Sequence, residues 1–210
     1  IPGSRPFNLT CFNGALYYVT PNTDDLVKIE IDPFGRMIQA YKVADLMNNN
    51  GHPGFVGDLA VDPNGLLHIS SDNVFATFDM RTLGDFTVVA STTNSRYAGL
   101  LFTIDGRLRA TRVDDTRIIH SVSLADGSST SSIPSVPFRG FGDLAGPQNR
   151  IPVDVPQGRH YFAQPASSII RELNIATGAN RVITWAAPWN IGGIAYDPET
   201  KVIYYSENPG

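Results

Sequence analysis

The chain has little cysteine, little charge and no long hydrophobic run. Cys11 is the only cysteine among 210 residues, so no disulfide can form within the chain. Charged residues make up 17% and form no basic run, which argues against nucleic acid as a partner. No apolar stretch reaches the roughly 18 residues of a membrane-spanning helix. The expected class is therefore a globular protein with no membrane span and no nucleic-acid partner.

Motifs of the common enzyme classes are also missing. The sequence contains no G-x-S-x-G, phosphate-binding loop, dinucleotide fingerprint or Ser-His-Asp order. Its four histidines, His52, His68, His120 and His160, do not follow a metal-ligand spacing. No segment of ten or more residues keeps a helical apolar stripe without a Gly or Pro. A hydrophobic fraction of 42% suffices for one core, and the missing helical stripe argues against helices. We therefore predict a single all-β domain over residues 1–210.

A repeat organises the chain, and its clearest sign is Gly-Asp-Leu-Ala at 57–60 and again at 142–145. Related hairpins begin at residues 6, 57, 98, 142 and 192. They start about 40 to 50 residues apart, which is the period of a four-stranded propeller blade. A second hairpin with two-residue alternation follows four of them, at 25–43, 73–91, 116–134 and 168–185. The sequence therefore predicts an all-β propeller with four complete blades and one partial blade.

The fifth copy, residues 192–206, supplies only two strands. An incomplete blade exposes unpaired backbone groups and apolar faces that pair readily with another chain. We therefore expect a ring of five or six blades that is completed by missing sequence or by another chain. On this interpretation the 210 residues are a fragment of a longer polypeptide, or the protein self-assembles through its incomplete blade.

The first strand of each propeller blade lines the central channel, where Gly permits close backbone approach and Leu-Ala fits the taper. The segments GDLAVDPNGLLHIS (57–70) and GGIAYDPETKVIYYS (192–206) fit this role. Through them the chain resembles the six-bladed propellers of the NHL-repeat and gluconolactonase-like (senescence-marker) group. The resemblance implies propeller architecture, in a group that includes enzymes, scaffolds and ligand binders.

Asp58 and Asp143 occupy the same inner-strand position, where the other copies have Phe7, Gly99 and Gly193. Two carboxylates pointing into one channel could hold Ca²⁺, with carbonyls, amides or water completing its shell. The alternative is that each aspartate accepts backbone N–H bonds. The resemblance to gluconolactonase-like proteins implies an acidic residue with Asn and Asp partners around one divalent ion, but this chain has no inner-strand Glu.

Loops on one face of a propeller commonly carry its function because they vary on a rigid scaffold. Aromatic, amide and guanidinium side chains gather in the loops expected on one such face, and they suit a glycan or a protein surface. The alternative is that the aromatic rings seal neighbouring blades together. Acidic residues on the same face, Asp24 and Asp25 among them, are expected to serve turn chemistry. The candidate ligand-binding residues are His52, Phe55, Arg96, Tyr97, Phe138, Arg139, Trp185, Trp189 and Asn190.

These features favour a non-catalytic propeller, extracellular or at the cell surface, that binds protein or glycan partners or builds a structural assembly. The alternative is a divalent-metal-dependent hydrolase of the lactonase type. A glycosylation sequon, Asn8-Leu9-Thr10, agrees with secretion. No cofactor is expected other than Ca²⁺ in the central channel.

Overall fold

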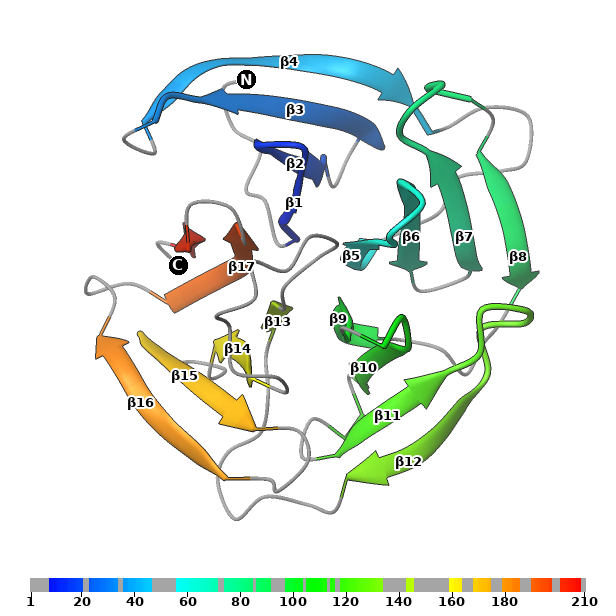
Figure 1. Ribbon diagram of the computed structural model, residues 1–210. Coiled ribbons are helices and arrows are strands. Elements are labelled where there is room, and N and C mark those ends of the chain that lie inside the picture. The colour runs from blue at the N-terminus through cyan, green and yellow to red at the C-terminus, as the bar shows by residue number, and fades with distance from the viewer. Residues whose placement is uncertain are drawn as a thin grey trace.

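The computed structural model is a ring of antiparallel β-sheets arranged around a central axis (Figure 1). Each sheet is one blade, and its first strand lies nearest the axis. The structure describes residues 8–20, 23–33, 36–46, 56–71, 74–84, 86–91, 97–103, 105–112, 114–115, 118–133, 143–145, 159–163, 168–174, 179–185, 190–197 and 201–208.

Four blades contain four strands each, ordered from the axis outward in chain order. Blade 1 consists of β1 (Thr10–Phe12), β2 (Ala15–Val19), β3 (Asp25–Ile31) and β4 (Met37–Asp45). Blade 2 consists of β5 (Val56–Val61), β6 (Leu66–Ser71), β7 (Val74–Asp79) and β8 (Thr87–Ser91). Blade 3 consists of β9 (Tyr97–Phe102), β10 (Leu108–Arg112), β11 (Ile119–Val122) and β12 (Ser129–Ile133). Blade 4 consists of β13 (Asp143–Ala145), β14 (Arg159–Ala163), β15 (Ile169–Asn174) and β16 (Asn180–Trp185).

Blade 5 has two described strands, β17 (Asn190–Asp197) and β18 (Val202–Asn208). The five inner strands contact one another in sequence, β1 with β5, β5 with β9, β9 with β13, and β13 with β17. β17 in turn contacts β1. The inner ring is thus closed by five blades, and the predicted all-β propeller of four complete blades and one partial blade is confirmed.

Turn chemistry sets the inner hairpins. In blade 1 Asn13 and Gly14 both have positive φ, 49° and 70°, and join paired residues Phe12 and Ala15. This two-residue connection suits the twist of a hairpin. In blade 2 the turn is longer, and the Asp62 carboxylate accepts the backbone N–H groups of Asn64 and Leu66. The Asp and Asn residues that mark each repeat therefore close hairpins.

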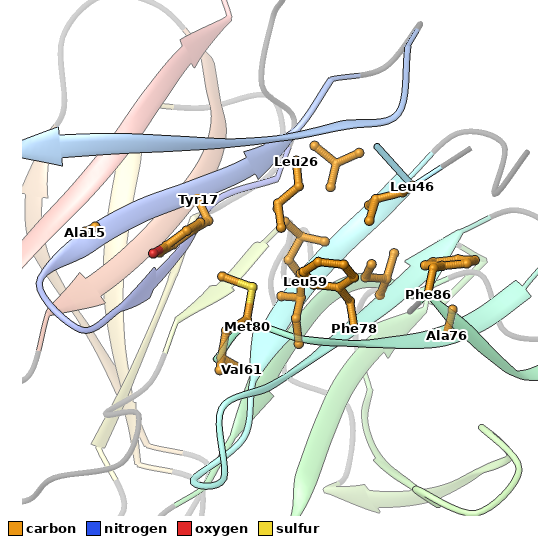
Figure 2. Close-up of a cluster of buried hydrophobic side chains, with 13 residues drawn as sticks. Ala15, Tyr17, Leu26, Leu46, Leu59, Val61, Ala76, Phe78, Met80 and Phe86 are labelled. Atoms are coloured by element: carbon orange, nitrogen blue, oxygen red, sulfur yellow. The ribbon is translucent and has the colours of Figure 1, made fainter. Parts of the chain in front are cut away.

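Among the described residues, hydrophobic side chains fill the seams between blades. The seam between blades 1 and 2 contains the largest described cluster, drawn in Figure 2. Tyr17 and Leu26 of blade 1 pack there with Leu59, Phe78 and Phe86 of blade 2. None of these five residues is more than 8% exposed. Burial of such side chains contributes roughly 1.5 to 3 kcal/mol each to folding, so the blade seams hold the ring together.

Glycines in the inner strands permit the close approach of neighbouring blades. A Cβ atom at Gly57 would collide with the backbone carbonyl oxygen of Tyr97 in blade 3. At Gly99 it would lie 2.9 Å from the backbone nitrogen of Leu144 in blade 4. The predicted role of glycine in the repeat is confirmed at these two positions.

Candidate functional site

Asp58 links two blades through its side chain. The residue lies in β5 and is 1% exposed, and its Oδ2 atom accepts the backbone N–H of Leu100 in β9. Leu100 follows Gly99, the residue at the equivalent position of blade 3. This contact supports the alternative of a backbone acceptor, in which the aspartate joins adjacent inner strands.

Asp143 lies in β13, directly opposite Ala163. Its side chain is outside the described part of the chain, so the expected Ca²⁺ site of Asp58 and Asp143 stays a prediction. Within the described residues, no group of three or more His, Cys, Asp or Glu side chains could hold a metal ion. The described residues also include no helix long and apolar enough to cross a membrane.

Asn8, and not Phe7, occupies the position of Asp58 in blade 1. Gly193 of β17 abuts Asn8 and Leu9, as Gly99 abuts Leu144. The Asn8 Oδ1 atom accepts the backbone N–H of Val19 at 2.8 Å, and the residue is 3% exposed. The expected glycosylation at Asn8 is therefore corrected, because a glycan on this amide would have to displace the packed inner strand.

Tyr97 does not belong to an exposed binding face. The residue is 0% exposed and packs in the seam between blades 2 and 3 beside Phe75. Its hydroxyl donates to the backbone carbonyl of Gly127 at 2.7 Å, and its N–H donates to Ser70 Oγ at 3.1 Å. The prediction that Tyr97 contacts a ligand is wrong, since the ring seals two blades and its polar atoms are satisfied inside the protein.

The other candidate face residues are not placed by the described structure. Trp185 ends β16 and Asn190 begins β17, but their side chains lie outside the described part. Six further candidates lie wholly outside the described part of the chain: His52, Phe55, Arg96, Phe138, Arg139 and Trp189. A ligand-binding face built from these residues stays a prediction.

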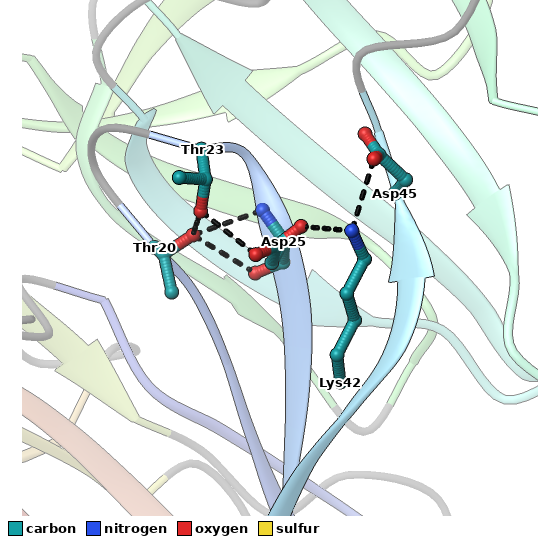
Figure 3. Close-up of polar contacts among 5 residues, drawn as sticks. All are labelled: Thr20, Thr23, Asp25, Lys42 and Asp45. Atoms are coloured by element: carbon teal, nitrogen blue, oxygen red, sulfur yellow. Dashed lines mark hydrogen bonds and ion pairs between the residues drawn. The ribbon is translucent and has the colours of Figure 1, made fainter. Parts of the chain in front are cut away.

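A polar cluster at the end of blade 1 includes the acidic loop residues (Figure 3). Thr20 Oγ1 accepts the backbone N–H of Asp25 at 2.9 Å, and Thr23 Oγ1 donates to the Asp25 carboxylate at 2.8 Å. Lys42 Nζ lies 2.5 Å from Asp25 and 2.9 Å from Asp45. The hydrogen bond to Asp25 raises the pKa of Lys42. The cluster closes a turn and partly neutralises its own charge, in agreement with the turn chemistry expected for Asp25.

Three histidines are buried, and His68 and His160 lie near residues of a neighbouring blade, a role that their sequence spacing did not indicate. His68 packs against the rings of Phe75 and Phe102, with its Nε2 atom 3.7 Å from an Asp62 carboxylate oxygen. Burial, which outweighs the nearby Asp62, lowers the pKa of His68. Burial and the charge of Arg109 lower the pKa of His160 to about 4. Burial also lowers the pKa of His120.

Four exposed apolar side chains lie on strands of blades 1 and 5. Met37 and Ile38 of β4 are 66% and 64% exposed, and Val202 and Tyr205 of β18 are 40% and 39% exposed. In Figure 1 the strands of blade 5, orange to red, lie between blade 1 in blue and blade 4 in yellow to orange. We call the edge of β18, together with the flanking outer strands β3–β4 and β15–β16, the open side of blade 5. No described strand pairs with the outer edge of β18.

Comparisons with known proteins place the fold. No protein-family model matches the chain, and no curated protein sequence matches it. Among solved structures, the nidogen/laminin complex aligns with a TM-score of 0.63 at 12% identity, over 99% of this chain and 73% of that one. Glutaminyl cyclase of Myxococcus xanthus aligns with a TM-score of 0.64 at 15% identity, over 97% and 86%. Virginiamycin B lyase of Staphylococcus aureus aligns with a TM-score of 0.52 at 15% identity, over 99% and 64%.

At such low identity these similarities establish the fold alone. The resemblance to NHL-type propellers expected from the sequence is confirmed at that level. The similar structures include enzymes and a protein–protein complex by their descriptions, so the fold is compatible with both of the function classes that the sequence left open.

Proposed function

We propose that the protein is a non-catalytic propeller that binds a partner protein, and that the partner covers the open side of blade 5. The exposed apolar side chains of β4 and β18 carry this proposal. Exposed apolar residues that stand singly are normal on protein surfaces, but a grouped set indicates an interaction site. Leu83 and Leu124, which are also more than 40% exposed, lie in the turns of blades 2 and 3.

The inner-strand geometry of Asp58 also favours binding over hydrolysis. A lactonase-type metal site needs carboxylate oxygens directed to an ion, whereas one Asp58 oxygen accepts the N–H of Leu100. Buried His68 and His160 lie in blade seams, where a substrate would have to separate the blades to reach them.

Site-directed photo-crosslinking in the cells that produce the protein tests the proposal. A photoreactive residue replaces Met37 in one variant and Leu124 in another. We expect a discrete adduct with one partner polypeptide from position 37 and none from position 124. Absence of an adduct at 37, or the same adducts at both positions, would contradict a partner on the open side of blade 5.

Two further expectations from the sequence belong to this proposal. A glycan ligand on the loop face involves residues outside the described structure, and a glycan array with Trp189→Ala beside the unchanged protein tests it. An extracellular or cell-surface location is tested by fractionation of the producing cells, where recovery only from the cell interior would oppose it.

A further inference from the structure

We propose that blade 3 is an acid-sensitive part of the ring, which separates from blades 2 and 4 as one unit when buried histidines in its two seams take up protons. This regulatory device goes beyond the proposed partner surface, which lies on blades 1 and 5. It follows from one position of the repeat that differs around the ring, from the burial of the imidazole rings, and from the cation that lies beside one of them.

One position of the second strand faces the next blade throughout the ring. Tyr17 at this position packs with residues of blade 2, and the ring of Tyr161 lies 5.0 Å from that of Tyr196 in blade 5. Tyrosine ordinarily titrates near pH 10, so it stays neutral in mild acid. Only the two seams of blade 3 differ, with His68 on one side and Arg109 on the other. The residues at this position in blades 1 to 5 are Tyr17, His68, Arg109, Tyr161 and Tyr204.

The imidazole of His68 is enclosed in the seam between blades 2 and 3. The residue is 2% exposed, and its ring lies 5.1 Å from that of Phe102 in blade 3. Its Nε2 atom is 3.7 Å from an Asp62 carboxylate oxygen, which is longer than a hydrogen bond. His120 lies opposite Ala110, whose side chain packs with blade 2, so His120 belongs to the same seam. A proton on either ring would place a charge in a largely apolar seam, and opening the seam to water relieves that cost.

The seam between blades 3 and 4 holds a cation beside a histidine. His160 is 2% exposed, and its Nδ1 atom has no hydrogen-bond partner in the described part of the chain. Arg109 of blade 3 donates a hydrogen bond to the neutral Ser121 hydroxyl at 2.7 Å. Burial and then the charge of Arg109 hold the pKa of His160 at about 4. A second positive charge would meet Arg109 in the closed seam, whereas water screens both charges once the blades separate.

The charged groups around the three histidines keep their charge over the relevant pH range. Arginine stays protonated and aspartate ordinarily titrates near pH 4, so neither changes much between pH 7 and pH 5. On the face of blade 2 that carries His68, these groups are Asp58, Asp62 and Asp79. Around His120 they are Arg112, Asp114 and Asp115. Around His160 they are Arg109, Arg171 and Asp105, which pairs with Arg107.

Amide exchange at Tyr97 and Leu100 tests the release of blade 3. Both amides donate across the seam to side chains of blade 2, Ser70 and Asp58. The amide of Val19 is the matched control, because it donates to a side chain within blade 1. After correction for the intrinsic effect of pH on exchange, the opening constants at Tyr97 and Leu100 should rise about twentyfold or more from pH 7 to pH 5. The opening constant at Val19 should change little.

The twentyfold rise is the contribution of His160 alone. Opening of blade 3 returns the pKa of His160 from about 4 to the ordinary 6.5, so the open state binds a proton first and is favoured as the pH falls. His160→Gln should therefore lower the rise at Tyr97 and Leu100 by about twentyfold, although both amides lie in the opposite seam. Tyr161→Phe is the matched control on the same strand, since Tyr161 faces blade 5 and should leave the rise unchanged.

Three results would overturn the release of blade 3 as a unit. An equal rise at Val19 would mean that the whole ring unfolds, and no rise at Tyr97 and Leu100 would mean that the seam stays closed. A rise that His160→Gln leaves intact would mean that the two seams open separately. The comparison of pH 7 with pH 5 uses the unchanged protein and decides the first two results even if a variant fails to fold.

Discussion

Blades 2 and 5 have similar inner hairpins and differ in what covers them. In blade 2 the second strand, β6, is paired on both sides, and Leu67 and Ile69 within it are fully buried. In blade 5 the second strand, β18, has one described neighbour, and Tyr205 is 39% exposed. The comparison teaches that the inner strands close the ring, whereas the outer strands bury the second strand. Closure of the ring needs only the inner hairpin that the repeat motif encodes, whereas burial of the second strand needs a blade with outer strands.

Truncating one aromatic side chain in each blade should give the largest difference in stability between blades 2 and 5. Phe78→Ala in blade 2 removes a ring that is 2% exposed in the seam with blade 1, and it should lower the free energy of unfolding by about 3 to 5 kcal/mol. Tyr205→Ala in blade 5 removes a ring with less covering and should cost about 1 kcal/mol or less. Urea unfolding measures both, and equal losses would show that blade 5 is as closed as blade 2.

Lowering the pH should reduce the stability of the seam between blades 3 and 4, where His160 is buried. The folded state holds the pKa of His160 at about 4, below the ordinary 6.5, because burial and Arg109 disfavour its charged form. The unfolded chain therefore takes up a proton first, and stability is lost as the pH falls from about 6.5 to about 4. The total loss from this residue is about 3 kcal/mol.

The variant His160→Gln isolates that contribution. Unfolding free energies measured between pH 7 and pH 4 should fall less steeply in the variant, by up to about 1.4 kcal/mol per pH unit. His68 and His120 also have lowered pKa values and keep part of the slope in both proteins. An unchanged slope would mean that His160 is not buried in its neutral form.

The inner ring itself should respond to loss of the Asp58 carboxylate. Asp58→Ala leaves the backbone N–H of Leu100 without this acceptor, which should cost about 1 to 3 kcal/mol. Circular dichroism melting of the variant, with and without Ca²⁺, separates the two roles considered for this residue. A stability loss that is the same in both conditions supports the inter-blade bond. A loss seen only with Ca²⁺ would support a metal ligand.

The smallest effect is expected at the surface of blade 1. Lys42→Met removes the exposed ion pairs with Asp25 and Asp45, and exposed pairs contribute little because water and salt screen them. The melting temperature should change within the scatter of replicate measurements, and less at high salt than at low salt. A large loss would show that this cluster holds the end of blade 1 together.

The repeat made most of the fold predictable, because strand alternation and turn residues are local features of a sequence. The hairpin predicted over 57–70 corresponds to β5 and β6. Residue-level alignment failed in blade 1, where Phe7 was assigned to the position that Asn8 occupies. The turn of that hairpin is shorter than the turn of blade 2, so alignment on the Asn-Gly pair shifts the inner strand by one residue.

The candidate site was less predictable, because it depends on contacts between blades. Tyr97 stands at the beginning of a strand, and nothing in the local sequence indicates that its hydroxyl reaches the carbonyl of Gly127, thirty positions further along. The buried histidines also became visible only when neighbouring blades were placed together. By contrast, the two described strands of blade 5 followed from the repeat alone, since the fifth copy of the motif reads as a single hairpin.

Amide hydrogen exchange in β18 and β6 tests the central claim most directly. The chain is kept dilute, so that association does not contribute, and exchange is followed residue by residue in Val202–Asn208 and in Leu66–Ser71. The account predicts that alternate amides of β18, those directed away from β17, exchange much faster than any amide of β6. Uniform protection of β18 at the level of β6 would contradict it, because the outer edge of blade 5 would then already be paired.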